Sequence, residues 1–454
     1  MSHRFTTTGR RFLAAASALL LTCVPAAAQD TRPGRAYRGL FGPDERNAAQ
    51  VLSVTGQVGA GYETGLLVDR HPIDGSVGNS SFFKSESVFS LFAGGISYLD
   101  HTDRLDFTAA FQSAARDYSR FAMITSHLAS SELTVRLSRR TTVSGFGRAT
   151  YQPWGNTIYS AALTDPAFGQ VVSPIREVAV LNGSYWTYSS GASISQQLSR
   201  RSTVSATYSY DVANFTGLAG NYEQQAAALR YAHGITRSLG WHVGYSYTDA
   251  KFGGQPTGYR ARGLDAGLDF NRSLSLTRKT QVGFSSGMSA IDSNVKLPLD
   301  RQGTQYGVTG AAWLNREISR TWSAIVSYNR NVAFFESLRA PYFYDSLSVG
   351  LGGLMSRRVG LRSTAGATYG DVGRTTGSGE SNRFVTGVAD TTLTIALTRN
   401  AALGVQYAYL FYSLDNPNAF WTAYTPDLGR HIVLVSVKAW VPIIERGRRG
   451  NATR

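Results

Sequence analysis

Twelve charged residues occupy positions where ionic chemistry could take place along one face of a sheet. Side chains of a strand alternate between two faces, and in segments such as 202–214 apolar residues take one parity while Ser, Thr and charged residues take the other. The basic residues of the polar parity are Arg136, Arg148, Arg230, Arg362 and Lys438, and the acidic ones are Asp106, Glu132, Asp211, Asp265, Asp269, Glu317 and Asp390. They could pair across neighbouring strands and keep an interior wet, or form a track for a polar or charged solute. Because acidic and basic residues nearly balance in number, we do not expect this face to select strongly for anions.

A second basic set follows a repeat. Seven times an aliphatic residue, Ser or Thr, and Arg stand together, at spacings of 61, 37, 41, 42, 37 and 42 residues. The arginines are Arg139, Arg200, Arg237, Arg278, Arg320, Arg357 and Arg399. Roughly forty residues suit a hairpin of two bilayer-crossing strands and one loop. We expect these arginines at the periplasmic rim, level with lipid phosphates; the alternative is that they are only soluble turn residues.

The histidines predict no catalytic site. Enzymatic acid–base chemistry needs a His with an acidic or nucleophilic partner in reach. His71 and His101 fall in connections, His233 and His431 lie near strand ends, and His127 and His242 are isolated in sequence. No spaced His or carboxylate cluster predicts a metal site. We therefore expect no catalytic residue, metal or cofactor, and an outer-membrane enzyme is the least favoured alternative.

The N-terminus predicts export. Three arginines precede an apolar run over 12–24 that ends in Ala26-Ala27-Ala28, which is typical of a signal peptide over residues 1–28. A lipoprotein signal around Cys23 is the weaker alternative, because Thr22 stands where such signals carry a smaller residue. Without residues 1–28 the chain holds no cysteine, which excludes disulfides.

The net charge of +15 does not predict nucleic-acid binding. Much of the excess lies in the seven turns and in the tail, so it favours phosphate headgroups or a partner at one rim. No later stretch is apolar for long enough to form a transmembrane helix.

The elements that must position these residues are 18 predicted strands. They fall near 50–62, 85–98, 104–117, 121–137, 141–152, 181–198, 202–214, 222–236, 239–251, 259–276, 279–291, 304–318, 321–335, 342–355, 358–371, 383–398, 401–414 and 429–441. This predicts an all-β, transmembrane, up-and-down antiparallel barrel over 50–441, with short periplasmic turns and longer extracellular loops. Residues 29–49 are predicted to be a flexible periplasmic leader and 442–454 a basic tail. The longest connection, 153–180, either folds inward as a constriction or caps the outside.

Three segments resemble β-barrel porin families of bacterial outer membranes. They are Gly-Ala-Gly-Tyr-Glu-Thr-Gly-Leu at 59–66, and the turn Leu-Ser-Arg-Arg-Thr at 137–141 with Val-Ser-Ala-Thr-Tyr-Ser-Tyr at 204–210. The resemblance implies a bacterial outer-membrane channel for passive passage of small polar solutes, with membrane lipid and the barrel-assembly machinery as partners. It extends to exopolysaccharide-export barrels, an alternative that adds periplasmic export proteins. A structural or adhesive barrel is a third possibility.

Overall fold

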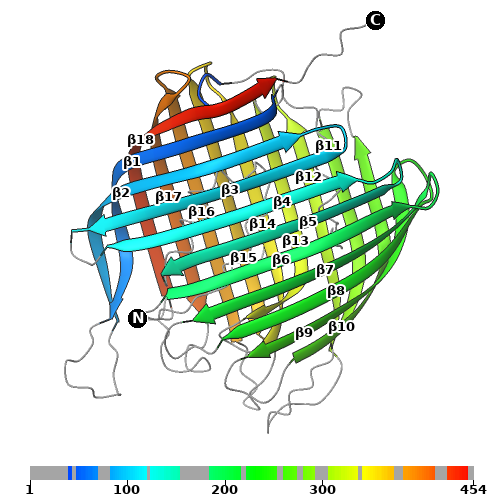
Figure 1. The fold of residues 1–454 in the computed structure, drawn as a ribbon. Coiled ribbons are helices and arrows are strands. Elements are labelled where there is room, and N and C mark those ends of the chain that lie inside the picture. Colours follow the sequence, from blue (N-terminus) through cyan, green and yellow to red (C-terminus); the bar gives the residue numbers. More distant parts are fainter. Residues whose placement is uncertain are drawn as a thin grey trace, which may run out of the picture.

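The computed structural model describes residues 39–42, 48–69, 82–119, 123–153, 184–215, 221–252, 259–273, 280–291, 305–335, 340–372, 382–414 and 427–447. They form 18 strands in one antiparallel sheet (Figure 1). The strands are β1 (Ala48–Asp69), β2 (Phe82–His101), β3 (Leu105–Tyr118), β4 (Ile124–Arg136), β5 (Thr141–Pro153), β6 (Ser184–Gln197), β7 (Ser202–Phe215), β8 (Tyr222–Gly234), β9 (Leu239–Phe252), β10 (Tyr259–Ser273), β11 (Thr280–Ile291), β12 (Gln305–Glu317), β13 (Ser323–Phe335), β14 (Ala340–Leu354), β15 (Val359–Val372), β16 (Asn382–Ala396), β17 (Ala401–Leu414) and β18 (Asp427–Gly447).

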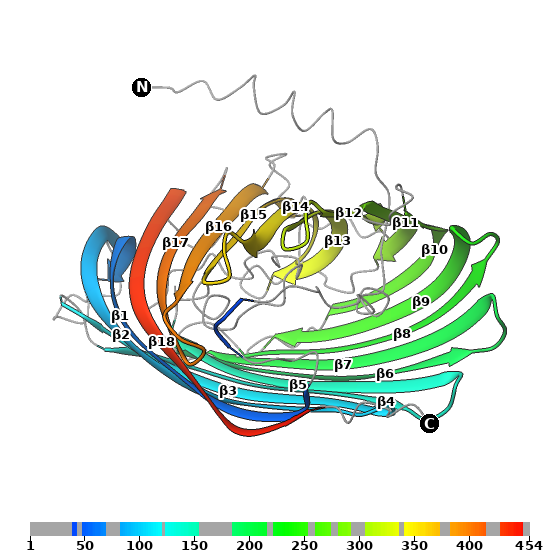
Figure 2. The ribbon, with the colours of Figure 1, turned by 90° about the horizontal axis from the view of Figure 1, so that it is seen from above.

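The sheet closes on itself. Each strand pairs with its successor in the chain, and β1 pairs with both β2 and β18 (Figure 2). Closure leaves no free edge strand, which is what a hydrocarbon environment demands of a sheet, although β10 and β11 pair only between 269–273 and 281–285. The prediction of an all-β up-and-down barrel of 18 strands is confirmed. Among the described residues, there is no helix long and apolar enough to cross a membrane.

The two faces of the sheet differ in chemistry. Residues paired directly across two antiparallel strands share a face. On one face apolar side chains stay exposed, among them Val58 (56%), Leu229 (55%) and Val437 (52%). On the opposite face Ser53 and Ser436 are buried. An apolar face this continuous is stable only against lipid, so it is the exterior of the barrel. The polar face is therefore the inner one.

In the described turns the repeated Ser or Thr binds backbone groups of its own turn. Ser199 Oγ accepts the backbone N–H groups of Arg201 (3.1 Å) and Ser202 (3.0 Å). Thr236, Ser319, Ser356 and Thr398 accept the corresponding pair of N–H groups in their own turns. The motif therefore supplies a side-chain acceptor for backbone donors that the end of the ladder leaves free.

The aliphatic residue before each Ser or Thr points outward. The six in described turns are 47% to 64% exposed: Leu137, Leu198, Ile235, Ile318, Met355 and Leu397. Their outward position continues the alternation of the strand that precedes each of these turns. The seventh turn, which holds Leu276 and Arg278, lies outside the described residues.

The last strand is longer than predicted. The barrel was expected to end at 441, but β18 continues to Gly447 and pairs Ile444 with Leu52 of β1. Pro442 lies opposite Ser53 beside a register shift. A proline has no N–H to donate, and a shift of this kind is where a strand tolerates it. The tail prediction of 442–454 was therefore wrong for residues 442–447.

The described part of the leader is attached to the barrel. The N–H of Leu40 donates to the carbonyl of Arg357 (2.9 Å), and that of Gly42 donates to the carbonyl of Arg399 (3.2 Å). Both acceptors belong to short turns, so residues 39–42 are bound to the rim of the barrel that carries these turns. β1 also begins at Ala48, two residues earlier than expected. The predicted signal peptide and the rest of the leader lie outside the described residues.

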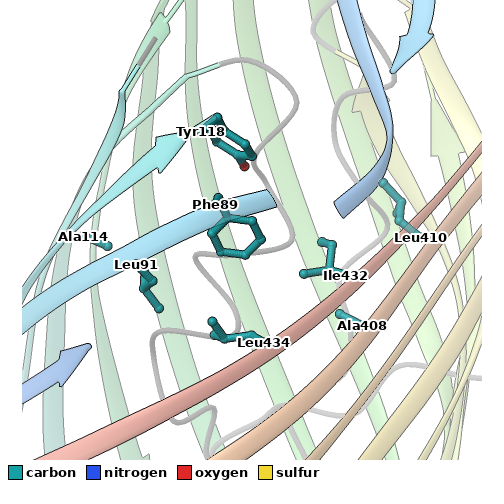
Figure 3. Packing of buried hydrophobic residues seen from close by; sticks show 8 residues of the cluster. All are labelled: Phe89, Leu91, Ala114, Tyr118, Ala408, Leu410, Ile432 and Leu434. Carbon is teal, nitrogen blue, oxygen red and sulfur yellow. The ribbon is translucent and has the colours of Figure 1, made fainter. Parts of the chain in front are cut away.

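A small apolar cluster lies on the inner face beside the closing strands (Figure 3). Its buried side chains are Phe89, Leu91, Ala114, Tyr118, Ala408, Leu410, Ile432 and Leu434. β1 lies between β2 and β18, and it carries Gly61 opposite both Phe89 and Leu434. A Cβ on Gly61 would lie 2.4 Å from Phe89 Cζ. The missing side chain thus lets residues of β2 and β18 meet across β1, where the N- and C-terminal strands close the barrel.

Candidate functional site

The strand register places all twelve predicted pore residues on the inner face. Arg230 follows the outward Leu229 (55% exposed), Asp265 follows Leu264 (63%), and Lys438 follows Val437 (52%). The others share faces with inner residues through their pairing: Arg136, Arg148, Arg362, Asp106, Glu132, Asp211, Asp269, Glu317 and Asp390. Whether they line a conducting pore stays a prediction.

Four charged groups of β8, β9 and β10 form one cluster. Arg230 Nη2 donates to both carboxylate oxygens of Asp269, at 2.8 and 2.9 Å. The ring of His242 lies between two carboxylates, with Nε2 3.2 Å from Asp265 Oδ2 and Nδ1 3.1 Å from Asp269 Oδ2. An imidazolium carries a proton on each nitrogen and so matches two groups that only accept. In that form the cluster holds two positive and two negative charges.

Glycines make room for this cluster. His242 is paired with Gly267, and Arg230 with Gly244. A Cβ on Gly267 would lie 3.1 Å from His242 Cε1 and would overlap the carbonyl of Ser286. The His242 side chain is fully buried as a result, although it belongs to the inner wall.

His242 was expected to be isolated, and that expectation was wrong. Its partners are distant in sequence, because Asp265 and Asp269 lie on the next strand and flank the glycine that faces the imidazole. The spacing Asp-x-Gly-x-Asp at 265–269 was the available signal. It becomes informative only once the register between β9 and β10 is known.

Other inner charges have polar neighbours. Asp390 accepts from Gln406 Nε2 (2.6 Å) and Thr392 Oγ1 (3.4 Å), both on the same face. Asp106 contacts His101 across the β2–β3 hairpin. Arg148 and Glu132 lie on adjacent strands and are both exposed on the inner face. The wall therefore presents acids and bases together rather than a belt of one sign.

The rim arginines differ in how they are held. Arg399 makes a bidentate ion pair with Glu445 (2.6 and 2.7 Å), and its guanidinium lies 5.5 Å from the Trp440 ring centroid. The other five described members are exposed at the tips of their turns: Arg139, Arg200, Arg237, Arg320 and Arg357. Arg278 lies outside the described residues.

A buried ion pair was missed by sequence reasoning. Glu63 on β1 and Arg430 on β18 contact each other with side chains 0% and 6% exposed, and Tyr118 Oη donates to Glu63 Oε2 (2.7 Å). The predicted first and last strands, 50–62 and 429–441, placed Glu63 just beyond a strand end. The usable signal was that Glu63 has the same odd-numbered parity as Ser53 and Gln57, which is the parity of the polar face of this strand.

The described residues contain no group of three or more His, Cys, Asp or Glu arranged to hold a metal ion.

Fold and wall together define the class of protein. A closed barrel of 18 strands, with an apolar exterior and a polar interior, is a transmembrane barrel of the bacterial outer membrane.

No protein-family model matches the chain, and no curated protein matches it in sequence. Among solved structures it is similar to OccAB4 of Acinetobacter baumannii, with 11% identity and a TM-score of 0.41 over 88% of this chain and 100% of that one. OccK9 (OpdG) of Pseudomonas aeruginosa is 11% identical with a TM-score of 0.40, over 86% and 98%. The siderophore receptor PirA of Acinetobacter baumannii is 8% identical with a TM-score of 0.38, over 85% and 80%. At this level of similarity nothing about a solute transfers to this chain.

Proposed function

We propose that the barrel is an outer-membrane channel through which small polar solutes pass passively. The observation that carries the proposal is the difference between the two faces of one continuous wall. An interior of Ser, Thr, Gln, Asn and balanced charges is wettable, and a barrel of this strand number is wide enough for a water-filled lumen. The twelve inner charges, as pore-lining residues, would give only modest ion preference because the two signs are mixed.

Conductance of the purified protein in planar bilayers tests this proposal. We expect steady ohmic currents, and a small zero-current potential under a KCl gradient. Deleting part of 154–180, which lies outside the described residues, should raise the conductance if that connection constricts the lumen. A barrel that stays closed to ions before and after this deletion would contradict the channel function and favour a structural role.

We also propose that the exposed rim arginines bind phosphate groups of periplasmic-leaflet lipids after the assembly machinery has inserted the barrel. Arginines at the headgroup level can extend toward phosphates while their stems stay apolar. Charge reversal of Arg200, Arg320 and Arg357 to Glu should slow insertion into anionic vesicles and leave the conductance of inserted barrels normal. Equal insertion of variant and wild type into anionic and neutral vesicles would show that they are only soluble turn residues.

A further inference from the structure

The inner wall has a shallow hollow of about 230 Å³ that spans β5 to β9. Nine of the residues at this hollow belong to the inner face: six are Ser or Thr, two are Ala226 and Ala228, and one is Phe146, whereas Ala192, Tyr208 and Ala227 have the outer parity. None of them is charged. The hollow lies near the middle of each strand, at Phe146 in β5, Thr207 in β7 and Ser246 in β9. A solute crossing the lumen along this wall must pass it.

Phe146 is an exposed aromatic residue on the polar inner face. It is paired with Glu132 and Gly191, both of the inner face, yet 48% of it is exposed. The other exposed large hydrophobic residues in regularly paired parts of the described strands all belong to the outer face. An aromatic ring left open on the water side is the kind of surface feature that marks a binding site.

The neighbouring backbone is shaped to receive this ring. A Cβ on Gly191 would lie 2.4 Å from Phe146 Cε1, so the ring lies over a position without a side chain. Beyond it the register joins Ser193, Thr207, Ala228 and Ser246 in one row of small side chains. The result is a flat aromatic face beside a low floor of methyl and hydroxyl groups.

Charges border the hollow without entering it. Glu132 lies beside the ring, Arg148 and Asp211 are each two residues from a lining residue, and Arg230 is bound to Asp269. The signs are mixed, so the border does not concentrate ions of one charge.

We infer that this hollow is a binding subsite for a neutral polyhydroxylated ring, such as a single hexopyranose unit of a sugar. The inference deepens the proposed channel function and rests on it. A pyranose has an apolar C–H face that can cover the exposed Phe146 ring, and hydroxyls at its edge. Ser and Thr hydroxyls both donate and accept, which suits partners that do the same. The volume is below that of pockets for drug-sized ligands, which fits one small ring.

Sugar-dependent block of single-channel current tests the subsite, with D-glucose and maltotriose as probes. In Phe146→Ala the concentration for half-block by maltotriose should rise about three- to tenfold, the equivalent of one lost aromatic contact. Phe146→Trp should retain the block, because a larger aromatic face is present. Phe92→Ala is the matched control, since Phe92 is 55% exposed on the outer face and should leave the block unchanged.

The hydroxyl floor has its own test. Thr207→Val keeps the shape and removes one hydroxyl, so it should weaken the block severalfold, whereas Thr364→Val on the inner face of β15 should not. A wild-type channel that conducts ions, with maltotriose block equal in Phe146→Ala, would overturn the subsite and leave the channel function standing. Stronger block by the zwitterion L-glutamine than by D-glucose would also overturn it, in favour of the bordering charges. Absence of conductance in the wild type would remove the channel function and the subsite together.

Discussion

The ion pair between Glu63 and Arg430 should be the most sensitive point of the closing seam. Replacing Arg430 by Met removes the guanidinium that contacts the Glu63 carboxylate, which is 0% exposed. Breaking a buried pair by removing one partner costs about 3–5 kcal/mol, because the remaining charge stays desolvated. We expect that loss in the free energy of unfolding of Arg430→Met, and a similar loss in Glu63→Gln.

The double variant tests whether the loss of stability comes from the charge that stays buried in each single variant. Glu63→Gln with Arg430→Met removes both charges of this pair, and the new amide can still accept from Tyr118. We therefore expect it to recover most of the stability, as paired replacements of buried ions commonly do. The rim pair of Arg399 and Glu445 serves as control, since its side chains are 47% and 28% exposed. Arg399→Met should cost only about 0–1 kcal/mol.

The assay is urea unfolding of the barrel in lipid bilayers, followed by tryptophan fluorescence under conditions where unfolding reverses. Arg430→Met no more destabilising than Arg399→Met would refute the desolvation argument. A double variant whose loss equals the sum of the single losses would refute it as well, because the two side chains would then act independently.

Three further perturbations test register, turns and lumen charge. Leu268→Arg, at an outward site 46% exposed, should cost about 2–4 kcal/mol in bilayers, whereas Thr364→Arg on the inner face should cost little; equal costs would invalidate the assignment of faces. Ser199→Ala removes the acceptor of two turn N–H groups and should lower the unfolding free energy by about 1 kcal/mol, with wild-type stability as the contrary result. Asp269→Asn leaves Arg230 without its bidentate partner and should move the zero-current potential toward anion preference; an unchanged potential would mean that this cluster does not influence permeation.

Most of the barrel was predictable because its determinants are local and periodic. Alternation with a period of two residues separates the faces of every strand, and the Ser or Thr of each turn binds backbone groups within three residues. Strand number, the outward position of the turn aliphatic residues and the inner position of the twelve charges all follow from such short-range patterns. The end of the last strand was misjudged, since the strand continues past Pro442, which a register shift accommodates.

What the sequence by itself determined was therefore which face each residue takes. Only the tertiary structure decided which residues meet, because contact across strands depends on register and on the position of glycines in neighbouring strands. His242 reaches Asp265 and Asp269 only because Gly267 lies opposite it. Glu63 meets Arg430, 367 residues away, only because the sheet closes. The open ring of Phe146 depends in the same way on Gly191, a residue of the next strand whose pairing no local pattern specifies.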